Sequence, residues 1–125
     1  MRSPVRACVV LVAGCLSAEA AWAQVLKDQV PGIRNLARVE STVACAGAIT
    51  PDAVPTIKMM GYKSIINLRL ATEPGADIDG HRAAAITAGI TYLHIPFSAA
   101  SPDPAAVDAF LKAIGAPEAA PAFIH

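Results

Sequence analysis

The sequence has few cysteines and few aromatic residues, and neither sign of charge dominates. Its 125 residues include three Cys, three Phe, two Tyr and one Trp, and ten basic side chains face ten acidic ones. Because the Lys and Arg residues are scattered singly, they form no basic patch of the kind that binds a phosphate backbone. The sequence therefore predicts no nucleic-acid partner, and a core built mainly from Ile, Leu, Val and Ala in a chain of single-domain length.

The apolar run at residues 7–18 is too short to span a bilayer, so no transmembrane span is predicted. Arg2 and Arg6 precede this run, and a small-residue site, "AWA", ends at Ala23. Charged start, short apolar centre and small-residue site together are typical of a secretory signal peptide. Residues 1–23 are predicted to be that peptide, and residues 24–125 to be an exported domain, periplasmic or secreted.

A second interpretation of the same segment stays open. The stretch "LVAGC", which ends at Cys15, resembles a bacterial lipobox, in which the cysteine is lipidated and anchors the protein. We favour cleavage after Ala23, because the apolar run before Cys15 is short. Cleavage after Ala23 leaves Cys45 as the last remaining cysteine, with no partner for an internal disulfide. Its apolar surroundings predict a small buried residue in a strand rather than a nucleophile.

From residue 35 onward, short strands alternate with helices. After an irregular lead-in at 24–34, we expect strands at 35–40, 42–49, 62–70, 91–97 and 121–125, and helices at 50–61, 77–89 and 101–115. Strands linked through helices over short connections predict an α/β fold with a parallel sheet and flanking helices. The continuous apolar run from Ser64 to Leu68 indicates a strand that is buried on both faces.

The pattern also predicts which residues cap two of the helices and which side of helix 77–89 is buried. We expect Asp79 to cap helix 77–89, with Ala83, Ala84 and Ile86 toward the sheet and His81 in solvent. Ser101 or Asp103 is expected to cap the last helix. Neither His81 nor His94 has a partner at the spacing of metal ligands, so we expect no metal site.

In a parallel sheet the carboxyl ends of the strands share one edge, where ligands bind. Three candidate site residues follow predicted strands at this edge: Arg69, Asp103 and His125. Arg69 could attract a phosphate group or form a bracing ion pair with Glu73, and we favour the ion pair.

The segments "GYKSIINLR", "HIPF" and "AFIH" resemble those of cysteine-dependent phosphatases of the dual-specificity type, and most closely the beta-lactamase hydrolase-like phosphatases, over residues 30–125. The resemblance implies a phosphatase-like sheet whose C-terminal helices are missing. It further implies hydrolysis of a phosphate ester or phosphoprotein through a cysteinyl-phosphate, without a cofactor. In that family the strand that ends in His runs directly into a Cys-X5-Arg loop.

His125 matches the histidine before the nucleophile, so the catalytic Cys and Arg of the family are absent from this chain. We therefore expect the chain to be inactive, although its family is enzymatic. The resemblance implies that His125 helps to shape the phosphate loop, whereas a frayed terminal residue is the plain alternative. Asp103 is the first candidate for general acid, with helix capping as its simpler role, and Asp108 is the second.

Two other functions stay open at this point. A rhodanese-like sulfurtransferase also combines a strand, a cysteine loop and a helix. A non-catalytic binding domain is the other alternative, because the chain lacks the family's nucleophile. The sequence does not indicate an oligomeric state.

Overall fold

The computed structural model describes residues 25–39 and 41–125, so the predicted signal peptide and Cys15 lie outside the described residues. The elements run β1 (Val25–Val30), β2 (Ile33–Val39), β3 (Val43–Cys45), the 3-10 turn η1 (Pro51–Ala53), α1 (Val54–Met59), β4 (Ser64–Asn67), α2 (Ile78–Ala88), β5 (Thr91–His94), α3 (Pro104–Gly115), the 3-10 turn η2 (Pro117–Ala119) and β6 (Ala122–Ile124). Within the described residues, no helix has the length and apolar character needed to cross a membrane.

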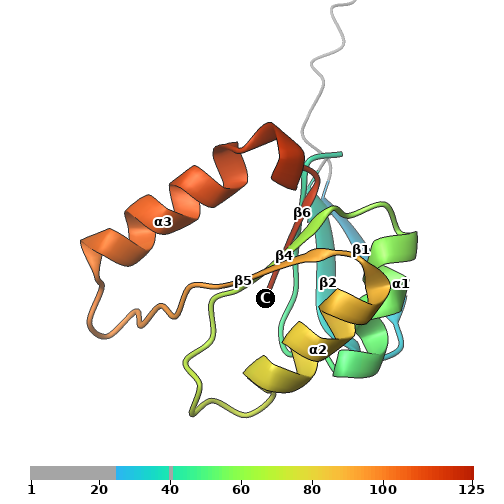
Figure 1. Ribbon diagram of the computed structural model, residues 1–125, viewed down its shortest axis with the longest axis horizontal. Helices are drawn as coiled ribbons and strands as arrows, with labels where there is room; N and C mark the ends of the chain where they lie inside the picture. The colour runs from blue at the N-terminus through green and yellow to red at the C-terminus, as the bar shows by residue number, and fades with distance from the viewer. Residues whose placement is uncertain (1–24, 40) are drawn as a thin grey trace, which may run out of the picture.

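The strands form one six-stranded sheet in the order β1-β2-β3-β6-β4-β5 (Figure 1). The pairs β3–β6, β6–β4 and β4–β5 are parallel, whereas β1–β2 and β2–β3 are antiparallel. The predicted α/β class and its parallel core are confirmed. β6, the last strand in the chain, lies in the interior of the sheet between β3 and β4.

The prediction of an irregular lead-in at 24–34 is wrong, because β1 occupies most of it. Gly32, at φ 77°, completes the turn that leads into β2, and Asp28 of β1 pairs with Arg38 of β2 at 2.6 Å. β1 is mostly exposed on both of its faces, so it has no alternation of apolar and polar residues to mark it. Antiparallel pairing with β2 makes this segment a strand.

Cys45 lies at the end of β3, as predicted, but it is exposed rather than buried. Its neighbour Ala44 is fully buried and packs in the core. Because successive side chains of a strand point to opposite faces, burial of Ala44 turns the Cys45 side chain to the other face of the sheet.

The main core lies between the sheet and the two helices α1 and α2. Ile57 of α1, Ile65 of β4 and Phe123 of β6 are fully buried in one cluster. Tyr62 packs edge-on against Phe123, with ring centroids 5.5 Å apart. Every residue of β4 is buried, which confirms the prediction of a strand covered on both faces.

The predicted orientation of α2 is wrong. Ile86 is 76% exposed, whereas His81 and Ala85 are buried. The cap is also two residues earlier than predicted: the Asp77 side chain accepts a hydrogen bond from the Gly80 amide at 3.2 Å. Packing against the sheet decides which side of a helix is buried. In α2 the small side chain of Ala85 and the hydrogen-bonded ring of His81 take the buried side, and the branched side chain of Ile86 points to solvent.

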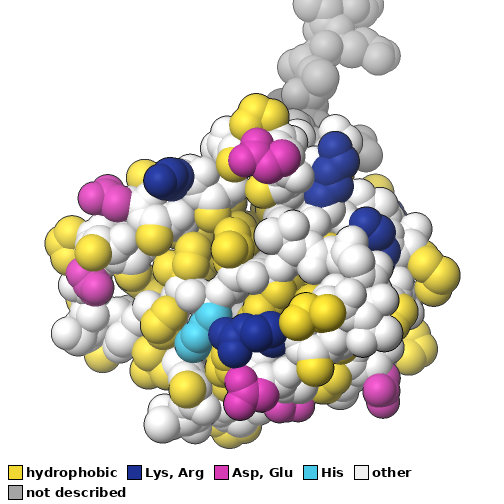
Figure 2. Space-filling view, viewed as in Figure 1, with side chains coloured by type: hydrophobic (Ala, Val, Ile, Leu, Met, Phe, Trp, Pro, Cys, Tyr) yellow, Lys and Arg dark blue, Asp and Glu magenta, His cyan; other side chains and the backbone are white. Residues whose placement is uncertain are grey.

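α3 covers the opposite face of the sheet. Leu68 directly follows β4, and its side chain points to the same face of the sheet as that of Ile66, opposite to that of Ile65. There it lines an apolar cavity together with Val107 and Phe110 of α3. No residue of α3 is buried, and Val107 and Leu111 are exposed. Hydrophobic side chains accordingly gather on the visible surface between α3 and the sheet (Figure 2). The side chains on this face are therefore buried much less completely than those on the face that α1 and α2 cover.

A matched pair of isoleucines tests the assignment of the core. We expect Ile57→Ala to lower the free energy of unfolding by about 2–5 kcal/mol, because it leaves a cavity in a fully buried site. Ile86→Ala removes the same atoms from an exposed helical site and should change stability by about 0.5 kcal/mol or less. Urea unfolding of both variants measures the difference, and equal losses would contradict the observed phase of α2.

Candidate active site

The carboxyl ends of β4, β5 and β6 meet at one edge of the sheet. Arg69 follows β4, His94 ends β5, and His125 follows β6. The backbone of His125 continues the sheet: its amide donates to Ile66 O at 3.0 Å, and its carbonyl accepts from the Leu68 amide at 2.7 Å. Two of the predicted site residues, Arg69 and His125, are therefore brought to the same edge.

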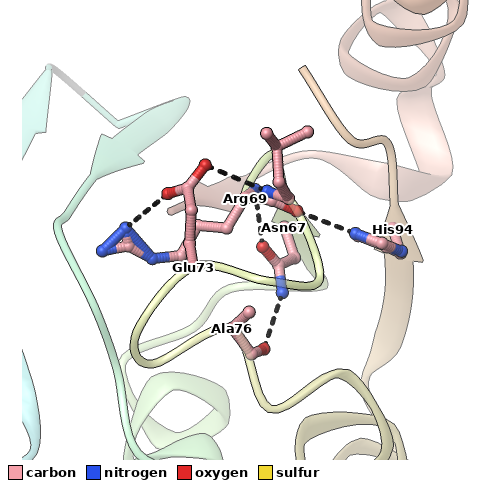
Figure 3. Close-up of polar contacts among 6 residues, drawn as sticks. Asn67, Arg69, Glu73, Ala76 and His94 are labelled. Atoms are coloured by element: carbon pink, nitrogen blue, oxygen red, sulfur yellow. Dashed lines mark hydrogen bonds and ion pairs between the residues drawn. The ribbon is translucent and has the colours of Figure 1, made fainter. Parts of the chain in front are cut away.

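Arg69 braces the loop between β4 and α2. Its guanidinium pairs with the Glu73 carboxylate at 3.3 Å, and the second Glu73 oxygen accepts from the Leu70 amide at 3.1 Å. The Arg69 carbonyl accepts from His94 Nε2 at 2.9 Å (Figure 3). The favoured interpretation of Arg69 as half of a bracing ion pair is confirmed. Its Nε is buried and has no partner among the described residues.

Asn67 is a key residue of this edge that the sequence analysis missed. It is fully buried at the end of β4, inside the run that the sequence analysis interprets as a continuous apolar strand. Its Oδ1 accepts from the Arg69 amide at 2.9 Å, and its Nδ2 donates to Ala76 O at 3.1 Å and Tyr92 Oη at 2.9 Å. The one signal in the sequence is an amide side chain inside an otherwise apolar strand, since such a residue needs buried partners.

His125 is buried, so the alternative of a frayed terminal residue is wrong. Its side chain is packed edge-on against His81, with ring centroids 5.2 Å apart, and neither ring nitrogen has a hydrogen-bond partner among the described residues. Burial, followed by the charges of His81, Arg69 and His94, lowers the pKa of His125 to about 3. The ring is therefore neutral at physiological pH.

His81 is also buried, which overturns the prediction that it lies in solvent. Its two ring nitrogens lie 2.9 Å from Ala76 O and 3.1 Å from Ile49 O. Together with Asn67 it ties the β4–α2 loop to two neighbouring segments. Among the described residues, no three His, Cys, Asp or Glu side chains are arranged to hold a metal ion.

Asp103 lies at the start of α3. Its Oδ1 accepts from the Ala105 amide at 3.0 Å, so its predicted capping role is confirmed. Within the described residues it forms no hydrogen bond or ion pair with Arg69 or His125. The start of α3 lies at the left of Figure 1, away from the end of β6. The structure thus does not join Asp103 to the other two candidates by direct contact.

An apolar cavity of about 230 Å³ borders this edge. It is lined by Leu68, Ile95, Phe97, Ala106, Val107 and Phe110. Since its walls offer almost no polar atoms, it has no donors for a phosphate group. Any anion at this edge would have to be held by Arg69 and by backbone amides instead.

The low pKa of His125 gives the fold a pH dependence. Between about pH 3 and pH 6.5 the unfolded chain binds a proton at His125 that the folded chain does not. The free energy of unfolding should therefore fall as pH decreases below about 6.5, by up to about 1.4 kcal/mol per pH unit from this group. In the variant His125→Asn this part of the acid dependence should disappear. Urea unfolding across this range provides the measurement, and identical acid profiles for both proteins would contradict the assignment.

Residues 35–124 of the chain match the family described as beta-lactamase hydrolase-like protein, phosphatase-like domain. Comparison with curated proteins gives no match.

Several solved structures share the fold. A protein assigned as a phosphatase (DUF442) from Shewanella putrefaciens CN-32 is 24% identical, with a TM-score of 0.66 over 75% of this chain and 59% of that one. A protein with the same general assignment from Neisseria meningitidis Z2491 is 23% identical, with a TM-score of 0.56 over 68% and 61% of the two chains. TpbA from P. aeruginosa, solved as a Cys-to-Ser variant in complex with pTyr, is 23% identical, with a TM-score of 0.59 over 87% and 60%. At these identities the likeness establishes the fold, and this chain spans about three fifths of each relative's length.

Proposed function

We propose that this chain, which belongs to the family of beta-lactamase hydrolase-like phosphatase domains, supplies the sheet and one wall of the active site of a phosphatase that hydrolyses phosphate monoesters through a cysteinyl-phosphate. One observation carries the proposal. An interior parallel strand, β6, is followed directly by buried His125 at the edge where the Arg69 loop also lies. In a parallel sheet this is the edge at which ligands bind.

The chemistry would need a loop that follows β6. A loop between a buried strand and a helix N-terminus presents several backbone amides to one anion. The same field lowers the pKa of a thiol and makes it nucleophilic at neutral pH. The 125 residues contain no Cys-X5-Arg sequence, and Cys45 is an exposed residue of β3. We therefore propose that this chain alone does not turn over phosphate esters.

The proposed substrate is a phosphorylated protein or small phosphate ester. The pTyr complex of TpbA supports a phosphorylated ligand for a protein of this fold. In this proposal Asp103 protonates the leaving oxygen and His125 supports the phosphate loop. Arg69 would add positive charge at the edge of the site while keeping its ion pair with Glu73. No cofactor is proposed.

The reading frame beyond codon 125 tests the proposal directly. We expect the next residues to give Cys-X5-Arg, and the extended protein to hydrolyse p-nitrophenyl phosphate while the 125-residue chain does not. Replacement of that cysteine by Ser should abolish turnover, because it removes the thiolate nucleophile. Turnover of thiosulfate instead of the phosphate ester would favour a sulfurtransferase, and absence of the motif in every frame would favour a non-catalytic domain.

The role of Asp103 can be separated from helix capping. Asn caps a helix about as well as Asp, so Asp103→Asn should leave thermal stability nearly unchanged. In the extended protein it should lower kcat by about 10²–10⁴-fold, since the leaving oxygen loses its proton donor. Asp108→Asn, on the exposed face of α3, is the matched control and should retain full activity. The reverse pattern would assign the proton donor to Asp108.

We also propose that the protein is exported. Cleavage after Ala23 should give a mature chain that starts at Gln24, which intact-mass measurement of the exported protein can determine. A mass increased by an acyl group on a chain starting at Cys15 would instead indicate a lipid anchor. A cytoplasmic full-length chain that still carries Met1 would contradict both forms of the proposal.

A further inference from the structure

The β4–α2 loop packs against the segment that connects β3 to η1, residues 46–50, here called the β3–η1 segment. Gly75 of the loop lies against Ala48 of this segment. A Cβ atom placed on Gly75 would lie 2.7 Å from the Ala48 Cβ, a separation that Cβ atoms in folded proteins essentially never show. Because the Ala48 methyl group is attached directly to the backbone, rotation of a side chain cannot relieve such a contact.

The β3–η1 segment is held in place by backbone hydrogen bonds to two strands of the sheet. At the end of β6, Ile124 O accepts from the Ala46 amide at 2.8 Å. On β2, Arg34 O accepts from the Gly47 amide at 2.7 Å, and the Arg34 amide donates to Ala48 O at 3.1 Å. Since the segment is fixed on both sides of Ala48, a clash at this residue is relieved by movement of the loop.

Short hydrogen-bonded steps connect Gly75 to the Arg69 ion pair. The next residue, Ala76, donates its amide to Glu73 O at 3.1 Å, and its carbonyl accepts from Asn67 Nδ2 at 3.1 Å. The Glu73 carboxylate pairs with the Arg69 guanidinium, and Asn67 Oδ1 accepts from the Arg69 amide (Figure 3). Both of these contacts of Arg69 lead back to Ala76, one residue from the point where the loop meets the β3–η1 segment.

We propose that Gly75 and Ala48 are positioning residues for the proposed phosphatase site, and that their contact sets where the Arg69 loop lies relative to the end of β6. The β3–η1 segment supports both elements, because it bonds the last residue of β6 through Ala46 and stops the loop at Ala48. A side chain at Gly75 would push the loop outward and displace the Arg69–Glu73 pair. The inference rests on the proposed function only for what this edge of the sheet does.

Two matched glycine variants separate this contact from backbone strain. Gly75→Ala places a Cβ against Ala48 at a φ of 77°, whereas Gly89→Ala adds the same atom at a φ of 68°, where nothing lies within 4 Å. Both variants carry the strain of an alanine at positive φ, so a difference between them reports the contact. Exchange of the Leu70 and Ala76 amides, whose bonds close the loop, should rise at least about fivefold in Gly75→Ala and stay within about twofold in Gly89→Ala.

Removal of the opposing methyl group should restore the loop. Ala48→Gly opens the space that the new Cβ needs, so the double variant Gly75→Ala/Ala48→Gly should show Leu70 exchange within about twofold of that in Ala48→Gly alone. The Arg69 Nε–H signal in ¹H–¹⁵N spectra is a second readout, which Gly75→Ala should shift and the double variant should return to its place in Ala48→Gly. Replacement of Ala by Gly does not by itself add stability, so recovery requires relief of the contact.

Equal loop exchange in Gly75→Ala and Gly89→Ala would overturn the proposal, and so would failure of Ala48→Gly to restore the loop. If Gly75→Ala does not fold, a folded double variant supports the contact, and an unfolded double variant beside a folded Gly89→Ala contradicts it. None of these readouts requires turnover. An inactive extended protein would therefore refute the proposed function and leave this result standing, whereas unchanged loop exchange would refute the positioning role and leave the proposed function standing.

Discussion

Parallel pairing of β6 between β3 and β4 is the contact on which the rest of the structure depends. The strand is only three residues long, yet Ala122 and Phe123 are buried, and Phe123 is a fully buried member of the main core. Without β6, β4 and β5 would be separated from the hairpin of β1 and β2 together with β3. Because the last strand in the chain fills the interior of the sheet, this fold requires contacts between residues far apart in sequence, which are slower to form than local ones.

The same pairing sets the geometry of the candidate site. β6 places His125 in register beside the ends of β4 and β5, and the backbone bonds to Ile66 and Leu68 fix it there. Around this point the protein buries three polar side chains, those of Asn67, His81 and His125. Buried polar groups are tolerated when they are bonded. Asn67 and His81 meet that condition. The ring of His125 has no hydrogen-bond partner among residues 25–39 and 41–125, and its low pKa keeps it uncharged in this buried position.

The two faces of the sheet differ in how completely they are covered. α1 and α2 close one face over a continuous apolar cluster. On the other face α3 buries none of its residues, and an apolar cavity remains between it and the sheet. Burial of apolar area is the main source of stability, so the face under α1 and α2 holds the domain together. The less completely covered face, under α3, includes the side chain of Leu68. The Leu68 amide donates a hydrogen bond to the His125 carbonyl, so packing on that face affects the position of His125 at the edge of the sheet.

Local patterns and near neighbours in the sequence were enough to predict the alternation of strands and helices, the doubly buried strand from Ser64, a cap at Ser101 or Asp103, and an ion pair between Arg69 and Glu73. The sequence also carried the family motifs through which His125 was placed at the site. Three features became visible only in the folded protein: residues 25–30 form a strand, Cys45 faces outward, and His81 rather than Ile86 faces the sheet. Each of these depends on a partner distant in sequence: β2 for the first strand, buried Ala44 within the paired β3 for the cysteine, and the carbonyls of Ile49 and Ala76 for His81. A local pattern contains no information about such partners until the chain has brought them together.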